Sequence, residues 1–85
     1  MAKLKPEDVL LNERISQRIK ELRTAQNSNQ SEFAQSHCID RQTLHRWENG
    51  GEKRGVSIHT VQKFCGMIGI SLKDFFDSPL FKKEP

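Results

Sequence analysis

Hydrophobic residues recur along the chain at the spacing of α-helices. Leu11, Ile15, Ile19 and Leu22 follow one another at intervals of four, four and three residues, which is one face of a helix. This first helix begins either at Pro6, where the following acids suit a helix N-terminus, or later at Asn12. It is expected to end near residues 26–29. Strand signals are poor, because the chain has no Tyr and no stretch of strict apolar–polar alternation.

Four further helices are predicted from polar N-cap residues followed by apolar side chains. Asn29 with Glu32 three residues later has the capping-box pattern and opens a short second helix that carries Phe33 and Ala34. This helix stops around residues 36–39. The N-caps expected for the third, fourth and fifth helices are Asp40, Ser57 and Ser71. An all-α, compact bundle of four or five helices follows from this pattern.

Apolar positions in the last three helices define the rest of the expected core. The third helix carries Leu44 and Trp47 and ends at the terminators Gly50 and Gly51. The residues expected inward on the fourth helix are Ile58, Val61, Phe64 or Cys65, and Ile68, with Gly66 and Gly69 weakening it. The fifth helix carries Leu72, Phe75 and Phe76 and is stopped by Pro79.

Length and composition narrow the class of protein. Eighty-five residues make at most one small domain with a thin core. Cys38 and Cys65 do not make a disulfide framework, no apolar run approaches a membrane span, and no secretory signal opens the chain. We therefore expect an intracellular protein without membrane contact. The balance of 14 basic against 11 acidic residues gives a net charge of +3, which permits nucleic-acid binding without proving it.

Two short helices at residues 30–36 and 41–49, with a few residues between them, are typical of a helix-turn-helix. The second helix of such a pair fits a major groove about 12 Å wide. On a helical wheel, Leu44 and Trp47 define its buried stripe. The opposite side carries Gln42, His45, Arg46 and Asn49, with Arg41 at its margin. Arg and Gln bind guanine and adenine edges, so this is either a DNA-reading face or a plain solvated one.

Five segments in order, with matching spacing, resemble the Cro/C1-type helix-turn-helix family of phage and bacterial regulators. They are residues 18–23 (RIKELR), 30–34 (QSEFA), 39–44 (IDRQTL), 47–50 (WENG) and 70–76 (ISLKDFF). The resemblance covers residues 13–77. It implies a lambda repressor-like bundle that binds operator DNA, usually as a dimer. Residues 1–12 would then be an N-terminal extension or the start of helix one, and residues 78–85 a short C-terminal tail.

The resemblance also implies roles for individual residues. Arg41, Gln42 and Arg46 match the base-reading positions. Positions that contact the DNA backbone are matched by Gln30, which also braces the recognition helix, and by Asn49, Lys53 and Arg54. His45 either contacts the backbone or is merely exposed. Arg23 and Glu48 match a pair that often forms a salt bridge between the first and third helices.

The chain departs from the family pattern at two places. Cys38 occupies a turn position that is often Gly, where φ tends to be positive, so mild strain or a shifted turn is expected there. Gly55 and Val56 stand where a Pro is common. Both departures concern loop geometry and neither threatens the fold.

Other chemistry is weakly supported. The spacing of His37, Cys38, His45, His59 and Cys65 shows no CxxC or HxxxH pattern, so no metal and no cofactor is expected. No paired carboxylate, nucleophile–base arrangement or phosphate loop indicates an enzyme or a small-molecule substrate. Some of the apolar residues Phe75, Phe76, Leu80 and Phe81 complete the core, and the rest offer a dimer interface.

These observations predict a sequence-specific, double-stranded-DNA-binding regulator, cytoplasmic and nucleoid-associated in a bacterium, that acts as a homodimer occupying an operator. One alternative is an antitoxin-like protein that also docks a protein partner. Another is a helical interaction module without DNA binding. The outward face distinguishes them, because a module that had lost DNA binding would tolerate acids at positions 41, 42 and 46, which here are Arg, Gln and Arg.

Overall fold

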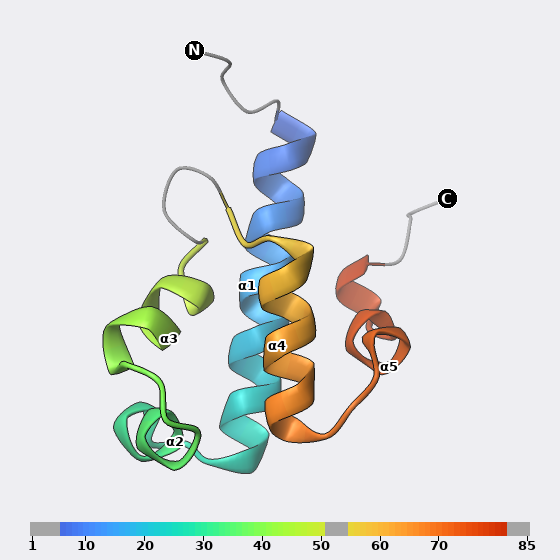
Figure 1. The fold of residues 1–85 in the computed structure, drawn as a ribbon. Helices are drawn as coiled ribbons and strands as arrows, with labels where there is room; N and C mark the ends of the chain where they lie inside the picture. Colours follow the sequence, from blue (N-terminus) through green and yellow to red (C-terminus); the bar gives the residue numbers. More distant parts are fainter. Residues whose placement is uncertain (1–5, 51–54, 82–85) are drawn as a thin grey trace.

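The computed structural model describes residues 6–50 and 55–81, and all regular secondary structure within these ranges is helical. The helices are α1 (Pro6–Gln26), α2 (Gln30–Ser36), α3 (Arg41–Glu48), α4 (Ile58–Ile68) and α5 (Leu72–Phe76), followed by a 3₁₀ turn at Pro79–Phe81. In Figure 1, α1 and α4 lie at the centre, with α2 and α3 on one side and α5 on the other. The predicted all-α bundle is thereby confirmed.

The core is built from one face of each helix. Its buried apolar residues are Ile15, Ile19, Phe33, Ala34, Leu44, Val56, Val61, Phe64, Cys65 and Phe75. Both Phe64 and Cys65 point inward, whereas the sequence pattern left the choice between them open. The rings of Phe64 and Phe75 meet edge to face, with centroids 6.2 Å apart, which ties α5 to α4.

Two residues predicted to face the core are exposed, and that part of the prediction is wrong. Leu11 is 46% exposed and Ile58 is 54% exposed. Leu11 lies one turn before buried Ile15, but the first turns of α1 extend past the start of α4, so the helix face continues beyond the elements that would cover it (Figure 1). Ile58 is the first residue of α4 and lies at this same end of the bundle.

Three of the four predicted N-caps form their side-chain hydrogen bonds. Asn29, Ser57 and Ser71 accept from the backbone N–H groups of Glu32, Thr60 and Asp74 at 3.0, 3.1 and 3.0 Å. The capping box at α2 is only half formed, because the Asn29 N–H donates to the Asn27 side chain instead of to that of Glu32. Asp40 occupies the N-cap position of α3 but makes no side-chain cap bond.

Glycines end two of the helices through left-handed backbone conformations. Gly69 has φ 76° and its N–H donates to the Cys65 carbonyl, so this residue terminates α4 rather than weakening its interior. Gly50 follows the C-cap of α3 with φ 91°. Gly51, the second expected terminator of α3, lies outside the described residues.

The C-terminal segment is held in place by a partly buried arginine contact from α1 and by aromatic packing. The Arg18 guanidinium donates to the carbonyls of Phe75 and Asp74 at 2.7 and 3.0 Å. The ring of Phe81 contacts that of Phe76, with centroids 5.0 Å apart, and both pack against the core. The apolar excess that suggested a self-contact in this region is therefore largely used within the fold.

Candidate nucleic-acid interface

Helices α2 and α3 form a helix-turn-helix, and the turn between them is set by backbone hydrogen bonds. The Ile39 N–H donates to the Ala34 carbonyl at 3.0 Å, and Leu44 N–H donates to the Asp40 carbonyl at the start of α3. Cys38, which lies between the end of α2 and Ile39, adopts φ 57°, the left-handed conformation expected from its position in the turn. A residue with a Cβ atom is strained in this conformation, so the turn keeps its geometry at some cost in stability.

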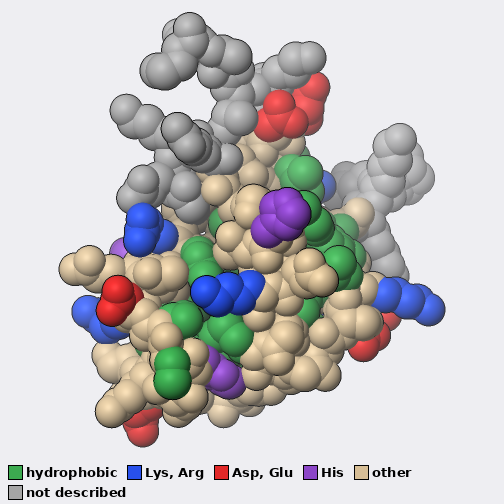
Figure 2. All heavy atoms as spheres, viewed as in Figure 1, with side chains coloured by type: hydrophobic (Ala, Val, Ile, Leu, Met, Phe, Trp, Pro, Cys, Tyr) green, Lys and Arg blue, Asp and Glu red, His purple; other side chains and the backbone are tan. Residues whose placement is uncertain are grey.

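Helix α3 is amphipathic, and its exposed side carries the residues that the wheel placed there. Arg41, Gln42, His45 and Arg46 are exposed and together line one shallow depression on the surface. Figure 2 shows basic side chains, a histidine and one acidic side chain along the edge of the molecule that α3 forms. The exposed N-cap Asp40 precedes this face, and no acid lies within it.

The buried side of α3 differs from the expected stripe. Leu44 is fully buried, but Glu48 is the second buried residue, and Trp47 is only half-buried against the core. The reason is spacing: Glu48 lies four residues after Leu44 and therefore almost directly beneath it, whereas Trp47 lies about 60° to one side. An acid occupies a core position of this helix because a basic residue on α1 faces it.

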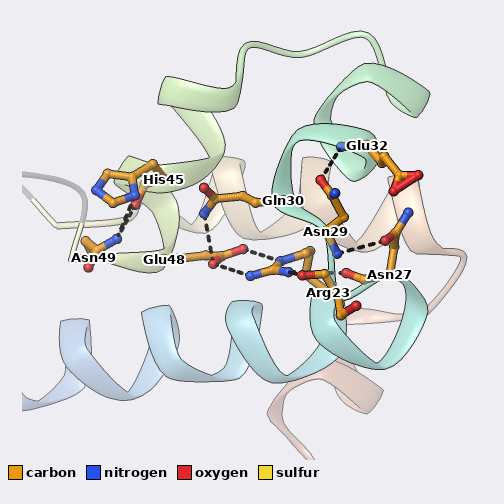
Figure 3. A network of polar contacts seen from close by, with 9 residues as sticks. Arg23, Asn27, Asn29, Gln30, Glu32, His45, Glu48 and Asn49 are labelled. Carbon is orange, nitrogen blue, oxygen red and sulfur yellow. Dashed lines mark hydrogen bonds and ion pairs between the residues drawn. The ribbon is translucent and has the colours of Figure 1, made fainter.

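Arg23 and Glu48 form the ion pair that the family resemblance implies. Arg23 Nε and Nη2 donate to the two carboxylate oxygens of Glu48 at 2.8 and 2.9 Å, a bidentate geometry. The side chains are only 6% and 2% exposed, respectively. Arg23 Nη1 also donates to the carbonyls of Asn27 and Ser28 at 3.2 and 3.0 Å (Figure 3). The pair thus joins the end of α3 to the end of α1.

Gln30 completes this network from the first residue of α2. Its Nε2 donates to Glu48 Oε1 at 3.2 Å, so one carboxylate contacts both α1 and α2 (Figure 3). The hydrogen bond to Glu48 raises the pKa of the Arg23 guanidinium, against the lowering effect of burial. Arg23 therefore stays charged, and its positive charge balances that of the buried Glu48 carboxylate at the end of α3.

A second contact braces α3 at Gly50, and the sequence reasoning missed it. The backbone N–H of Gly50 donates to Ser16 Oγ at 2.8 Å, and Ser16 is buried on α1. The only available signal was a small polar residue on the inward side of α1, three residues before Ile19. The helical spacing of α1 carried no indication of the partner of this residue, which lies 34 positions away.

The remaining candidate residues are placed as follows. Asn49 is exposed and its Nδ2 donates to the His45 carbonyl at 2.7 Å, so it turns back onto the last turn of α3 (Figure 3). Lys53 and Arg54 lie outside the described residues. The structure therefore brings together the α3 residues, joins Gln30 to them through Glu48, and leaves the loop after α3 undescribed.

The two cysteines differ in environment. Cys38 is exposed in the turn, whereas Cys65 is buried on α4 and its burial raises the pKa of the thiol. Across residues 6–50 and 55–81, no three His, Cys, Asp or Glu side chains converge as metal ligands would. In the same ranges, no helix combines the length and apolar character required to cross a bilayer.

A helix-turn-helix with an exposed polar second helix defines a class of DNA-binding domains. The chain matches the helix-turn-helix family over residues 19–75, which is more than half its length, and it belongs to that family in its Cro/C1-type form. This family consists of DNA-binding transcription regulators. The match includes α2, α3 and α4 in full and begins inside α1. The comparisons with curated proteins and with solved structures gave no significant match.

Proposed function

We propose that this protein is a bacterial or phage transcription regulator that binds double-stranded DNA sequence-specifically and occupies an operator through α3. The single observation that supports this most is the exposed face of Arg41, Gln42, His45 and Arg46 on a helix held from behind by the Arg23–Glu48 pair. Four side chains that pair with base edges or phosphates lie on one side of a helix whose other side is fixed. A helix so fixed can present them in one orientation to a groove.

Arg41, Gln42 and Arg46 are the proposed base-reading residues. They project from the start and the outer face of α3, on the side away from Leu44. Arg donates bidentately to guanine and Gln bonds bidentately to adenine, so these side chains give preference for particular base pairs. Each good pair of this kind discriminates against the wrong base by roughly 1–3 kcal/mol.

The proposed backbone contacts come from residues that flank α3. Gln30 is held by its bond to Glu48 at the start of α2, and His45 and Asn49 lie at the end of α3. Lys53 and Arg54 belong to the following loop. Phosphate contacts of this kind fix the position of a protein on the duplex without reading sequence, and they make binding depend on salt.

We further propose that two copies bind adjacent half-sites about 34 Å apart on one face of the duplex. One helix of eight residues reads too few base pairs to be specific alone. The antitoxin-like alternative, with a protein partner in addition to DNA, keeps the same α3 assignment. The interaction-module alternative does not keep it, so DNA binding by the isolated protein decides between them.

The test is selection of bound sites from random duplexes, followed by binding of the selected and unrelated duplexes across a salt series. Gln42→Ala and Arg46→Ala should weaken binding of the selected site by roughly 1–3 kcal/mol and relax preference at one base position each. Lys53→Ala and Arg54→Ala should weaken all duplexes alike and reduce the salt slope by about one unit. Lys73→Ala, which removes an exposed charge from α5, is the control and should change neither property.

Equal weakening of every duplex by Gln42→Ala and Arg46→Ala would show that α3 is not the reader. Failure to enrich any sequence, with weak salt-dependent binding to all, would indicate a nonspecific binder. No binding at all would leave the interaction module as the correct function.

A further inference from the structure

The largest exposed apolar residues of the described chain gather at one end of α1. They are Val9, Leu10 and Leu11, which are 42%, 45% and 46% exposed, with Ile58 nearby at the start of α4. Three consecutive exposed aliphatic residues are unusual on so small a protein, because apolar surface is normally buried when a partner is available. The first turns of α1 stand clear of α3, α4 and α5 in Figure 1.

Four residues form a stripe on this part of α1, which we call the α1 stripe: Glu7, Leu10, Leu11 and Arg14. Their spacing of i, i+3, i+4 and i+7 places them on one side of the helix. On the wheel, the centre of the stripe lies roughly 140° from the face that buries Ile15, Ser16 and Ile19, with Leu11 at the edge nearest that face. Leu10 faces away from the core, and Leu11, at the margin of the core-facing side, lies beyond the helices that would cover it, so the stripe is uncovered.

The α1 stripe has two leucines in its middle and opposite charges at its ends. Glu7 is exposed and Arg14 is half-exposed. Among the residues that the structure describes, neither makes a hydrogen bond or an ion pair with another side chain. An acid at one end and a base at the other give the stripe a direction.

That direction makes the stripe complementary to itself. When two α1 helices lie antiparallel about a twofold axis between Leu10 and Leu11, each Glu7 meets the Arg14 of the second copy and the leucines meet each other. When the helices lie parallel, Glu7 meets Glu7 and Arg14 meets Arg14, which is repulsive. A patch that fits its own copy about a twofold axis is what a symmetric dimer requires.

We infer that the α1 stripe is the surface through which two copies of this chain associate, with their α1 helices antiparallel. The inference rests on the proposed function for its use, since two copies are what an operator with two half-sites needs. Two leucines and two ion pairs are far less than a standard interface of about 1,600 Å², so association is weak in solution. It becomes effective when both copies are already held on one duplex and their local concentration is high.

The test uses the full-length chain without DNA, studied by sedimentation over a wide concentration range. The wild-type protein should show a reversible monomer–dimer equilibrium. Glu7→Arg places arginine against Arg14 at both symmetric contacts, and Arg14→Glu places glutamate against Glu7. Each variant should raise the dissociation constant of the dimer by roughly tenfold, since each turns two weak attractions into repulsions.

An equimolar mixture of the two variants is the decisive measurement. In a mixed dimer, one chain supplies arginine at positions 7 and 14 and the other supplies glutamate at both, so both contacts are attractive again. The mixture should therefore dimerise about as well as the wild type, while each variant alone does not. Lys20→Glu is the control, because it makes the same charge change as Arg14→Glu on an exposed part of α1 outside the stripe.

Three results would overturn the inference: a wild-type monomer up to millimolar concentration, single variants that dimerise like the wild type, or a mixture that does not recover. Far-UV circular dichroism of each variant checks that α1 still forms. Binding of a duplex that carries one half-site, measured by fluorescence anisotropy, tests the proposed DNA function separately, because a single copy suffices there. A protein that binds this duplex but never dimerises would refute the stripe and keep the DNA function.

Discussion

Replacing Glu48 with glutamine changes one oxygen to an amide nitrogen and removes one buried charge. The carboxylate accepts three hydrogen bonds, two from Arg23 and one from Gln30. Glutamine offers only one acceptor oxygen, and its NH₂ group turns a donor toward the Arg23 or Gln30 donors. Arg23 keeps its two carbonyl partners, at Asn27 and Ser28, but loses the only negative charge that the described structure pairs with it.

The expected loss follows from the burial of this pair. Breaking one side of a buried ion pair costs about 3–5 kcal/mol, whereas exposed pairs contribute about 0–1 kcal/mol. Because Arg23 retains two backbone hydrogen bonds, the lower end applies, and Glu48→Gln should lower the free energy of unfolding by about 3 kcal/mol. For a domain of this size that corresponds to a fall in Tm of roughly 12–24 °C.

Glu21→Gln is a matched control that makes the same chemical change in an exposed pair. Glu21 Oε1 lies 3.7 Å from Arg18 Nη1, and the Glu21 side chain is 48% exposed. Urea unfolding followed by the fluorescence of the single tryptophan, Trp47, and by circular dichroism should give a loss below about 1 kcal/mol for this control. If Glu48→Gln lost no more than Glu21→Gln, the pair would not be what anchors α3 to α1.

Two further predictions concern the caps and the thiols. Asn29→Ala should lower the free energy of unfolding by about 1 kcal/mol, and Asp40→Ala by clearly less, because Asn29 makes a side-chain cap bond and Asp40 does not. Equal losses of the two variants in urea unfolding would contradict this. At about pH 8, a thiol reagent should modify exposed Cys38 quickly and Cys65 only on unfolding, because burial both shields Cys65 and raises its pKa. Two equivalents consumed at one rate in the native protein would show that Cys65 is accessible.

Features governed by neighbours in the chain were predictable. The side-chain caps at Asn29, Ser57 and Ser71 join residues three positions apart, so the sequence pattern located them. The exposed side of α3 also follows from local spacing, whereas the positive φ of Cys38 was implied by the resemblance to the family's turn. All of these need only the geometry of one helix or one turn.

Features governed by what covers a surface were not predictable in the same way. Leu11 has the right spacing for the core, but it lies in the first turns of α1, which extend beyond the other helices of the bundle. The wheel did not place Glu48 on the buried side of α3, because its burial depends on Arg23 from another helix, and only the family resemblance implied that pair. Ser16 bonds Gly50 across a similar distance in sequence. The attachment of α5 through Arg18 likewise requires two segments more than 50 residues apart to be placed together.

The network behind α3 separates the residues that hold this helix from those that we propose to read DNA. Leu44, Glu48 and the Gly50 N–H anchor it through partners on α1 and in the core. Arg41 and Gln42 are exposed, and their side chains make no hydrogen bond or ion pair to other described residues. Substitutions at these two positions should therefore change the free energy of unfolding little. Under the proposed function, a lineage carrying this scaffold can drift from one target sequence to another without passing through unfolded intermediates, and a protein engineer can randomise the same positions for new specificity.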